Sequence, residues 1–255
     1  MLNIVIPIAG RGSRFVEAGY TLPKPLIPVH GIPMIEAVVD NIRPKVTHKF
    51  TFVALQEHLD LLEMRVTLER IAPGCTIIPV NKVTEGAACT VLLAKEIIDN
   101  EYPLMLANSD QWVDIDINDY LADLDRKNAD GLIMTMWADH PKWSYIGINE
   151  NGFINKVVEK QVISNEATVG IYNFRHGSDF VRAAEQMITG NLRVNNEFYV
   201  APVYNEMINW GAKVAFYNVG RDGKGMYGMG VPVDLNEFIQ NPVSNKILSN
   251  RKSER

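Results

Sequence analysis

A glycine- and arginine-rich segment near the N-terminus has the composition of a phosphate-binding loop. It reads Gly-Arg-Gly-Ser-Arg from Gly10 to Arg14 and directly follows an apolar run from Leu2 to Ala9. Glycines let backbone N–H groups approach and surround a phosphate oxygen, and arginine binds phosphate through two parallel hydrogen bonds. The segment is not a P-loop, because it lacks the Gly-Lys-Ser/Thr ending. It is not a dinucleotide-binding fingerprint either, because Phe15 stands where the third glycine is needed.

A lysine held between two prolines follows this loop. Pro23, Lys24 and Pro25 come after a spacer of eight residues. Proline restricts its own backbone and that of the residue before it, so Lys24 is expected in an extended, stiff backbone. A lysine held in this way is costly to place unless it binds an anion. The loop and the lysine together predict a binding site for phosphate groups.

The spaced pattern of Gly-x-Gly-Ser-Arg and Pro-Lys-Pro resembles the signature of the sugar-phosphate nucleotidyltransferases. These GT-A-like α/β enzymes join a nucleoside triphosphate to a phosphate monoester, and the resemblance extends over most of the chain. It implies that the glycine loop and Arg14 hold the triphosphate and the departing pyrophosphate. It also implies that Lys24 neutralises charge at the reacting centre, so Arg14 and Lys24 are the implied catalytic residues. The implied nucleotide-binding residues are Ala9, Gly10, Arg11, Gly12, Ser13, Glu85, Gly86 and Ala87.

Two further positions complete the nucleotide side of this resemblance. The segment Glu85-Gly86-Ala87 resembles the family's base-recognition turn, in which Gly86 leaves room for the nucleobase ring. Asp110, at the end of an apolar run, matches the family's strand-end aspartate that binds Mg²⁺. A hard cation prefers carboxylate oxygen and keeps waters while it bridges phosphates. The resemblance thus implies Mg²⁺ as the cofactor and Asp110 as its ligand.

The acceptor side of the resemblance lies in the second half of the chain. Glu159 and Lys160 resemble the family's Glu-Lys motif, in which the lysine holds the acceptor phosphate and the glutamate a hydroxyl group. The proline that commonly follows is replaced here by Gln161. Gly170 resembles a glycine of the following strand that permits close approach of the acceptor, and Glu197 stands at the place of the family's acidic-aromatic acceptor motif.

One departure from the family concerns the metal. Many members place a second metal-binding aspartate two residues before a Gly-Thr-Pro turn, and the comparable turn here is Gly230-Val231-Pro232, with Gly228 at the aspartate's position. Either the metal has a single protein carboxylate, Asp110, or a neighbour replaces the second. Asp222 is the nearest acidic candidate upstream, and a solvent-exposed Asp-Gly turn is its ordinary role. We predict the site with one carboxylate.

Strands and helices alternate over the first part of the chain, with residues 10–22 predicted as a loop. The predicted strands are 2–9, 49–55, 76–80 and 103–107, and the predicted helices are 33–42, 57–71 and 86–98. This alternation builds a parallel sheet with helices on both faces. Ligands of such sheets bind beyond the carboxyl ends of the strands, where the glycine loop and Asp110 lie.

The second half is predicted to be mixed, with a hairpin at Asn151-Gly152. The predicted strands are 131–138, 145–149, 154–159, 168–174 and 213–219, and the predicted helices are 178–188, 197–210 and 233–239. The fold class is therefore α/β, with a mostly parallel, Rossmann-like (GT-A-like) sheet flanked by helices. We predict one domain, with a nucleotide-side half at 1–130, an acceptor-side half at 131–248 and a flexible tail at 249–255.

The composition excludes several classes of protein. The 255 residues are 47% hydrophobic and 22% charged, as in an ordinary globular protein, and the formal net charge is −5. Nucleic acid is therefore not an expected partner. No apolar run reaches the roughly 18 residues of a membrane helix, so no membrane partner is expected. The N-terminus lacks the order of regions that a signal peptide has, and the chain is predicted to be cytoplasmic.

The sequence therefore predicts a Mg²⁺-dependent nucleotidyltransferase that joins a nucleoside triphosphate to a small phosphorylated acceptor. Sugar 1-phosphate is the first choice of acceptor, for surface glycan biosynthesis, and a cytidylyltransferase for a non-sugar phosphate is an alternative. A GT-A glycosyltransferase is a second alternative, because Asp114-Ile115-Asp116 has the spelling of that class's metal motif. A regulatory homologue that only binds nucleotide is a third. The nucleobase, the acceptor and the formation of a homo-oligomer are left open.

Overall fold

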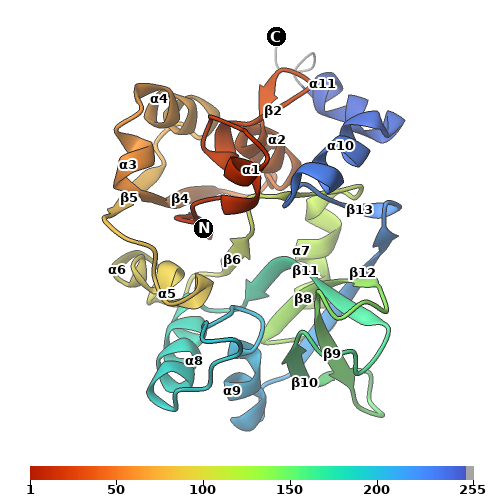
Figure 1. The fold of residues 1–255 in the computed structure, drawn as a ribbon. Coiled ribbons are helices and arrows are strands. Elements are labelled where there is room, and N and C mark those ends of the chain that lie inside the picture. Colours follow the sequence, from red (N-terminus) through yellow and green to blue (C-terminus); the bar gives the residue numbers. More distant parts are fainter. Residues whose placement is uncertain (251–255) are drawn as a thin grey trace.

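The computed structural model describes residues 1–250, which form one large mixed sheet and its flanking helices (Figure 1). Within these residues eleven strands join the sheet in the order β5-β4-β1-β6-β11-β8-β12-β13-β7, with β9 and β10 attached through β11. Two short strands, β2 (Pro28–Val29) and β3 (Ile32–Pro33), form a separate pair. The strands of the large sheet are β1 (Leu2–Ile8), β4 (His48–Leu55), β5 (Thr76–Val80), β6 (Leu104–Ala107), β7 (Gln111–Val113), β8 (Gly131–Trp137), β9 (Ser144–Ile148), β10 (Ile154–Glu159), β11 (Glu166–Phe174), β12 (Val214–Asp222) and β13 (Gly225–Gly228).

The first part of this sheet is parallel and the second part is mixed. Strands β5, β4, β1 and β6 run in the same direction, so their carboxyl ends share one edge of the sheet. Strand β11 runs antiparallel to both β6 and β8, and β12 runs parallel to β8. The predicted α/β class is therefore confirmed. Strands from both predicted halves of the domain lie in one sheet, and the division between these halves stays a prediction.

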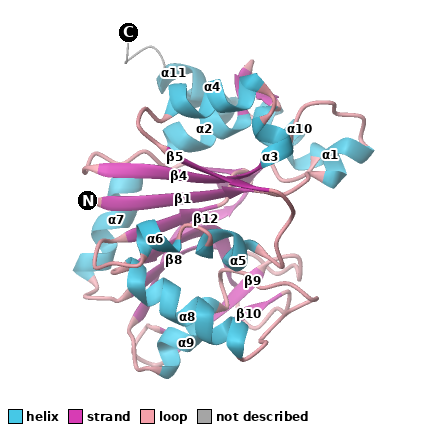
Figure 2. Cartoon of the chain, turned by 90° about the vertical axis from the view of Figure 1, so that its left-hand side faces the viewer, coloured by secondary structure: helices cyan, strands magenta, loops and turns pink. Residues whose placement is uncertain are grey.

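Helices cover both faces of the sheet (Figure 2). Successive residues of β1 point to opposite faces: Ile4 and Ile6 join the core beneath α2 and α4, whereas Val5 joins the core beneath α5 and α8. No helix within residues 1–250 has the length and hydrophobicity needed to span a membrane. The helices are α1 (Ser13–Glu17), α2 (Met34–Asn41), α3 (Gln56–Leu59), α4 (Leu62–Ile71), α5 (Ala87–Leu92), α6 (Lys95–Ile98), α7 (Ile117–Arg126), α8 (Gly177–Thr189), α9 (Val203–Asn209), α10 (Pro232–Gln240) and α11 (Lys246–Asn250), with 3₁₀ turns η1 (Lys24–Leu26) and η2 (Pro242–Asn245).

Several predicted elements have different bounds in the structure. The helices predicted at 57–71 and 86–98 are each broken into two, because the apolar spacing continues across a turn that it does not reveal. The helix predicted from residue 197 begins at Val203, because Pro202 has no N–H to donate inside a helix. Residues 10–22, predicted as a loop, contain helix α1. Ser249 and Asn250 end α11, and the rest of the predicted tail, residues 251–255, lies outside the described residues.

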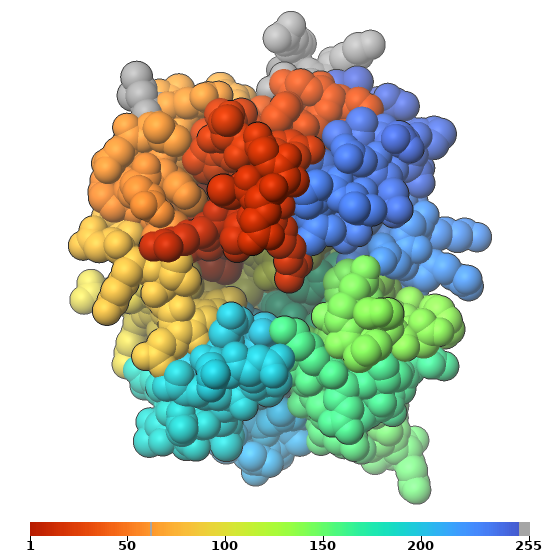
Figure 3. All heavy atoms as spheres, viewed as in Figure 1, coloured from red at the N-terminus to blue at the C-terminus, as the bar shows by residue number. Residues whose placement is uncertain are grey.

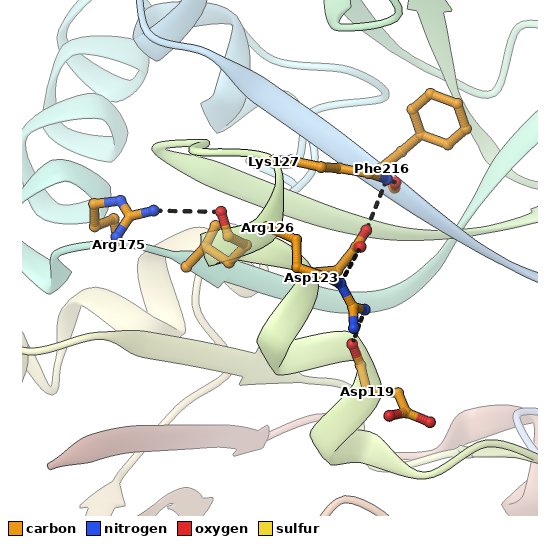
Figure 4. Close-up of polar contacts among 7 residues, drawn as sticks. Asp119, Asp123, Arg126, Lys127, Arg175 and Phe216 are labelled. Carbon is orange, nitrogen blue, oxygen red and sulfur yellow. Dashed lines mark hydrogen bonds and ion pairs between the residues drawn. The ribbon is translucent and has the colours of Figure 1, made fainter.

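Helix α7 has no counterpart among the predicted elements and is joined to the sheet by polar contacts at its C-terminal end (Figure 4). Asp123 forms ion pairs with Arg126 at 3.1 Å and with Lys127 at 2.7 Å. Lys127 also donates to the backbone carbonyl of Phe216 in β12 at 2.5 Å. The hydrogen bond from Lys127 links the end of α7 to β12, whereas the two ion pairs lie within the helix and its C-cap. None of these contacts involves a residue of the predicted site.

Candidate active site

Two adjoining pockets open on the face of the molecule shown in Figure 3, between the red N-terminal segment and the cyan and green segments. The N-terminal pocket has a volume of about 410 Å³ and is lined mainly by residues 7–10, 12, 24–25, 83–84, 86–87 and 90. The C-terminal pocket has a volume of about 460 Å³ and is lined mainly by residues 142–144, 159–160, 168–170, 172, 226, 228, 230–231 and 234. The residues that line both are Ala87, Asn108, Asp110 and Tyr199. Two ligands bound side by side would therefore meet at this shared wall.

The glycine loop connects β1 to α1 and lines the N-terminal pocket through Ala9, Gly10 and Gly12. Gly12 has a φ of 63°, a left-handed conformation, and precedes the first turn of α1. A Cβ at Gly12 would lie 3.0 Å from the Cβ of Lys24. The missing side chain therefore lets the loop pack directly against this lysine.

The polar side chains of the loop are placed differently from its glycines. Arg11 and Ser13 are exposed and line neither pocket. Arg14 is exposed as well and lines the C-terminal pocket rather than the N-terminal one. The contact of these three residues with a triphosphate stays a prediction.

Lys24 and Asp110 form an ion pair where the two pockets meet. The Nζ of Lys24 donates to Oδ2 of Asp110, and the two side chains are 17% and 26% exposed. The backbone carbonyl of Asp110 accepts a hydrogen bond from the N–H of Met229 at 2.7 Å. A Cβ at Gly230 would lie 3.0 Å from Oδ2 of Asp110, so the lack of a side chain there leaves space beside the carboxylate. Three distant parts of the chain thus converge on one charged group.

The backbone at Lys24 differs from the predicted extended conformation. Lys24 begins the 3₁₀ turn η1, which includes Pro25, and its carbonyl accepts a hydrogen bond from the N–H of Ile27 at 3.1 Å. Proline fits the first turn of a helix because it needs no partner for an N–H there. The extended residue is Pro23, with φ −52° and ψ 140°. The stiffness expected around Lys24 thus comes from a hydrogen-bonded turn.

The predicted base-recognition turn is tied to the segment around Phe198. Gly86 has a φ of 135°, and a Cβ there would lie 2.5 Å from the backbone nitrogen of Phe198. The N–H of Phe198 donates to the carbonyl of Glu85 at 2.8 Å, and the N–H of Ala88 donates to the carbonyl of Phe198 at 3.0 Å. Gly86 and Ala87 line the N-terminal pocket. The close approach of residue 198 accounts for the glycine, whereas the predicted room for a nucleobase stays a prediction.

The side chain of Glu85 does not line the N-terminal pocket. It is exposed and forms an ion pair with Arg193 at 2.5 Å. The guanidinium of Arg193 also lies 4.3 Å from the ring centroid of Phe198. The exposed side chain of Glu85 therefore links the turn to the 193–198 segment through this ion pair. Any contact of the Glu85 backbone with a nucleobase stays a prediction.

Glu159 ends β10 and lies at the wall of the C-terminal pocket with only 9% of its surface exposed. The hydroxyl of Ser144 donates to Oε2 of Glu159. Burial raises the pKa of the Glu159 carboxyl above its ordinary value, while the Ser144 hydrogen bond opposes this shift. The site thus holds a buried carboxyl group with one oxygen already hydrogen-bonded.

Lys160 has a φ of 54°, an uncommon conformation for a residue with a side chain. Its N–H donates to the carbonyl of Trp143 at 3.0 Å, and its Nζ donates to the hydroxyl of Tyr199 at 2.9 Å. The hydrogen bond to Tyr199 raises the pKa of Lys160, so the amine is held in its charged form. Strained backbone of this kind is concentrated at functional sites. The structure thus presents a positive charge at the C-terminal pocket.

Gly170 and Glu197, the other two predicted acceptor residues, line different pockets. Gly170 has a φ of 92°, and a Cβ there would lie 2.6 Å from Nε2 of Gln111, so the glycine makes room for this buried amide. Among the described residues the Nε2 of Gln111 has no hydrogen-bond partner. Gly170 and Gln111 both line the C-terminal pocket, whereas Glu197 lines the N-terminal one. Contact of Gly170 and Glu197 with an acceptor stays a prediction.

Two residues of the pocket walls, Tyr199 and Gln111, have no role assigned to them from the sequence. Tyr199 contacts Lys160 and lines both pockets, and Gln111 follows Asp110 directly in the chain. The position of Gln111 beside Asp110 is the one local signal that could have indicated it. The contact of Tyr199 with Lys160 depends on packing between segments 39 residues apart.

Asp222 lies apart from the Asp110 carboxylate. Its Oδ2 is 3.5 Å from the Nζ of Lys142, and it lines a smaller pocket with Trp137 and Arg221. Two acidic residues share the C-terminal pocket with Asp110: Glu159, described above, and Asp234, in the first turn of α10.

The two aspartates of the Asp-x-Asp sequence, Asp114 and Asp116, make contacts outside the two pockets. Asp114 forms an ion pair with Lys246 at 2.6 Å. Asp116 is the N-cap of α7, and its carboxylate accepts a hydrogen bond from the N–H of Asn118 at 2.9 Å. Neither aspartate lines the two pockets, so the geometry does not favour the glycosyltransferase alternative.

The donor set at Asp110 fits a magnesium ion that is shared with phosphate ligands. Within residues 1–250 no group of three or more His, Cys, Asp or Glu side chains is placed to hold a metal by itself. Mg²⁺ is commonly bound through one or two carboxylates, with waters and substrate phosphates as its other ligands. Asp110 offers such a carboxylate, and Gly230 leaves space beside it.

The chain is similar in sequence and structure to known proteins. Residues 4–196 match the family model described as nucleotidyl transferase. The chain is 28% identical over 179 residues to the mannose-1-phosphate guanylyltransferase catalytic subunit beta of Danio rerio, a match that covers 68% of this chain and 49% of that protein. It is 30% identical over 154 residues to a UTP–glucose-1-phosphate uridylyltransferase of Salmonella typhimurium, covering 52% of this chain and 50% of that one. The chain spans about half the length of these curated relatives.

A solved structure extends the likeness past residue 196. The nucleoside-diphosphate-sugar pyrophosphorylase from Vibrio cholerae RC9 superposes with a TM-score of 0.78 and 25% sequence identity, over 93% of this chain and 100% of that one. The fold is thus the GT-A-like α/β fold that the sequence predicts. Together with the family model, which matches most of its length, this likeness establishes that the chain belongs to the nucleotidyl transferase family.

Proposed function

We propose that the protein is a nucleotidyltransferase that joins a nucleoside triphosphate to a sugar 1-phosphate and releases pyrophosphate. The observation that carries this proposal is the shared wall of the two pockets, where Lys24 and Asp110 form an ion pair. One pocket is bordered by a glycine loop, and the other by a charged lysine and a buried carboxyl group. This arrangement suits two phosphorylated substrates whose phosphates meet at a single point.

The N-terminal pocket is proposed to hold the nucleoside triphosphate. Backbone N–H groups of Gly10 and Gly12 would bind phosphate oxygens, and the amine of Lys24 would transfer its contact from Asp110 to the phosphates. A magnesium ion bound by Asp110 would supply further neutralisation of phosphate charge. Lys24 and the loop thereby align the α-phosphorus and stabilise the pyrophosphate that leaves.

The C-terminal pocket is proposed to hold the phosphate monoester. A monoester is already anionic at neutral pH, so no side chain has to act as a nucleophile. Lys160 would orient the acceptor phosphate for in-line attack on the α-phosphorus. The new bond joins an acceptor oxygen to that phosphorus, and the bond from it to the bridging oxygen of pyrophosphate breaks. The work of the protein is alignment and charge neutralisation.

Two observations support a sugar as the acceptor. The C-terminal pocket is lined by hydroxyl, amide and carboxyl groups, including Ser144, Thr168, Gln111 and Glu159, which suit the hydroxyl groups of a sugar. The relatives named above act on mannose 1-phosphate and glucose 1-phosphate. We propose that the product is an activated sugar for surface glycan assembly. The reaction consumes a nucleoside triphosphate, and we place it in the cytoplasm, where these are made.

A pyrophosphate-release screen tests the proposal. Four nucleoside triphosphates, each with Mg²⁺, are combined with sugar 1-phosphates and with non-sugar phosphates such as phosphocholine. Release with a sugar 1-phosphate is expected, and release with non-sugar phosphates alone would favour the cytidylyltransferase alternative. Binding of a triphosphate without any release would indicate a regulatory homologue. Calorimetry of Arg14→Ala without acceptor then decides whether Arg14 contacts the triphosphate, as the sequence predicts, since loss of that contact weakens binding.

A further inference from the structure

Gly228, the last residue of β13, lines the C-terminal pocket and lies next to the side chain of Asp234. Strand β13 pairs with β7 so that Gly228 lies opposite Gln111, the neighbour of Asp110. A Cβ at residue 228 would lie 3.4 Å from Oδ2 of Asp234, which is an ordinary van der Waals contact. The carboxylate of Asp234 therefore stands directly beside the place where a side chain of residue 228 would begin.

Asp234 and Asp110 approach the same short segment of chain. Oδ2 of Asp110 lies against Gly230, and Oδ2 of Asp234 lies against Gly228, two residues earlier. Both aspartates line the C-terminal pocket. The segment thus has two glycines, each facing one carboxylate.

The Asp234 carboxylate is not part of an ion pair among the described residues, although Arg14, Lys142 and Lys160 line the same pocket. It is half-buried, and among the described residues none forms a hydrogen bond or ion pair with its side chain. An acidic residue in the first turn of a helix ordinarily interacts with the free N–H groups of that helix. Among the described residues no N–H group of α10 donates to the Asp234 side chain. A half-buried carboxylate without such a partner, in the same pocket as the carboxylate of Asp110, is suited to a cation.

We propose that Asp234 is the second carboxylate ligand of the divalent cation that Asp110 binds, and that it replaces the side chain that Gly228 lacks. This inference rests on the proposed function, since the cation would be shared with the phosphates of the substrates. Mg²⁺ commonly uses one or two carboxylates and completes its shell with waters and phosphates. This two-carboxylate site differs from the single-carboxylate site expected from the sequence. In the proposed site Asp222 is not needed for binding of the cation.

Binding of Mn²⁺ to the full chain, measured by electron paramagnetic resonance without nucleotide, tests the proposal independently of turnover. Asp234→Asn and Asp110→Asn are each expected to weaken Mn²⁺ binding at least about tenfold, because loss of even a residue that only orients a metal ligand commonly costs about 10–100-fold in affinity. Asp222→Asn is the matched control and is expected to bind Mn²⁺ as the parent does. In the double variant Gly228→Asp with Asp234→Asn, a carboxylate returns beside the same gap and binding is expected to recover.

Thermal unfolding separates this role from a purely structural one. Mn²⁺ should raise the unfolding midpoint of the parent and of Asp222→Asn, but not that of Asp234→Asn. A lower midpoint of Asp234→Asn without metal, together with an unchanged response to Mn²⁺, would show that the residue only stabilises α10. That result, or equal Mn²⁺ affinity in Asp234→Asn and the parent, overturns the inference and leaves the proposed function intact. If no pyrophosphate were released in the screen while the variants showed the expected changes in Mn²⁺ binding, the proposed function alone would be refuted.

Discussion

Replacement of Lys24 by methionine should separate its role in turnover from its role in stability. Lys24→Met keeps most of the length of the side chain and removes its charge. In the structure this charge contacts Asp110 at the point where the two pockets meet. Removing one preorganised group that stabilises transition-state charge lowers turnover by about 10²–10³, or about 2.7–4 kcal/mol. We therefore expect a loss of turnover in this range.

The effect of the same change on folding should be small. The side chains of Lys24 and Asp110 are 17% and 26% exposed, so solvent screens their attraction and hydrates the aspartate that remains. Exposed ion pairs contribute about 0–1 kcal/mol to stability, and we expect the loss of unfolding free energy to lie near the upper end of this range. The ratio of the two effects distinguishes a group that acts on substrates from one that only supports the fold.

The assay compares pyrophosphate release at saturating Mg²⁺ with the urea-unfolding midpoint. Lys246→Met is the matched control, because Lys246 pairs with Asp114 at 2.6 Å outside both pockets. It should lose a similar amount of stability and no turnover. If folded Lys24→Met released pyrophosphate as fast as the parent, the assignment of the shared wall as the reacting centre would be wrong.

Three further changes follow from the same geometry. Gly86→Ala should cost about 1–3 kcal/mol of unfolding free energy, because its Cβ would lie 2.5 Å from a backbone nitrogen at a φ of 135°. Gly74→Ala, where nothing lies within 4 Å, should cost less in the same urea titration; equal losses would contradict the steric argument. Burial raises the pKa of Glu159 above its ordinary 4.5, so its contribution to stability is present below pH 4.5 and is lost as the pH rises through the folded pKa. Glu159→Gln should therefore flatten the fall of the unfolding midpoint above pH 4.5, and an unchanged pH profile would disagree with the buried carboxyl. Asp110→Asn should abolish Mg²⁺-dependent turnover while Asp222→Asn changes it little, and a large rise in the Mg²⁺ concentration for half-maximal rate in Asp222→Asn would place a ligand there.

The sequence predicts well those features that depend on neighbours in the chain. Strand β5 has the predicted bounds, and Lys24 and Asp110 both line the N-terminal pocket, because each follows a local pattern at a strand end or between prolines. The sequence does not predict where helices break, because the apolar spacing in residues 57–71 continues through the turn between α3 and α4. The break depends on packing against β4 and β5 and has no signature in the spacing.

Gly86 and Gly170 show what the sequence does not predict, namely which groups lie against a required glycine. Gly86 and Gly170 are positions where a side chain does not fit, but the groups that exclude it are protein atoms: the backbone of Phe198 and the amide of Gln111. A pattern identifies a glycine that is needed, whereas only the fold identifies what approaches it. The same applies to Asp234, whose proximity to residue 228 arises from the turn between β13 and α10.

The segment of Phe198 and Tyr199 connects the walls of the two pockets. Gly86 at the N-terminal pocket is in contact with Phe198, and the adjacent Tyr199 holds the amine of Lys160 at the C-terminal pocket. The turn at Gly86 is therefore joined to the segment that positions Lys160, because two backbone hydrogen bonds link residues 85–88 to Phe198. Lys160 is itself in a left-handed conformation that its N–H bond to Trp143 helps to hold. The segment that positions the charge of Lys160 at the C-terminal pocket therefore also borders the N-terminal pocket.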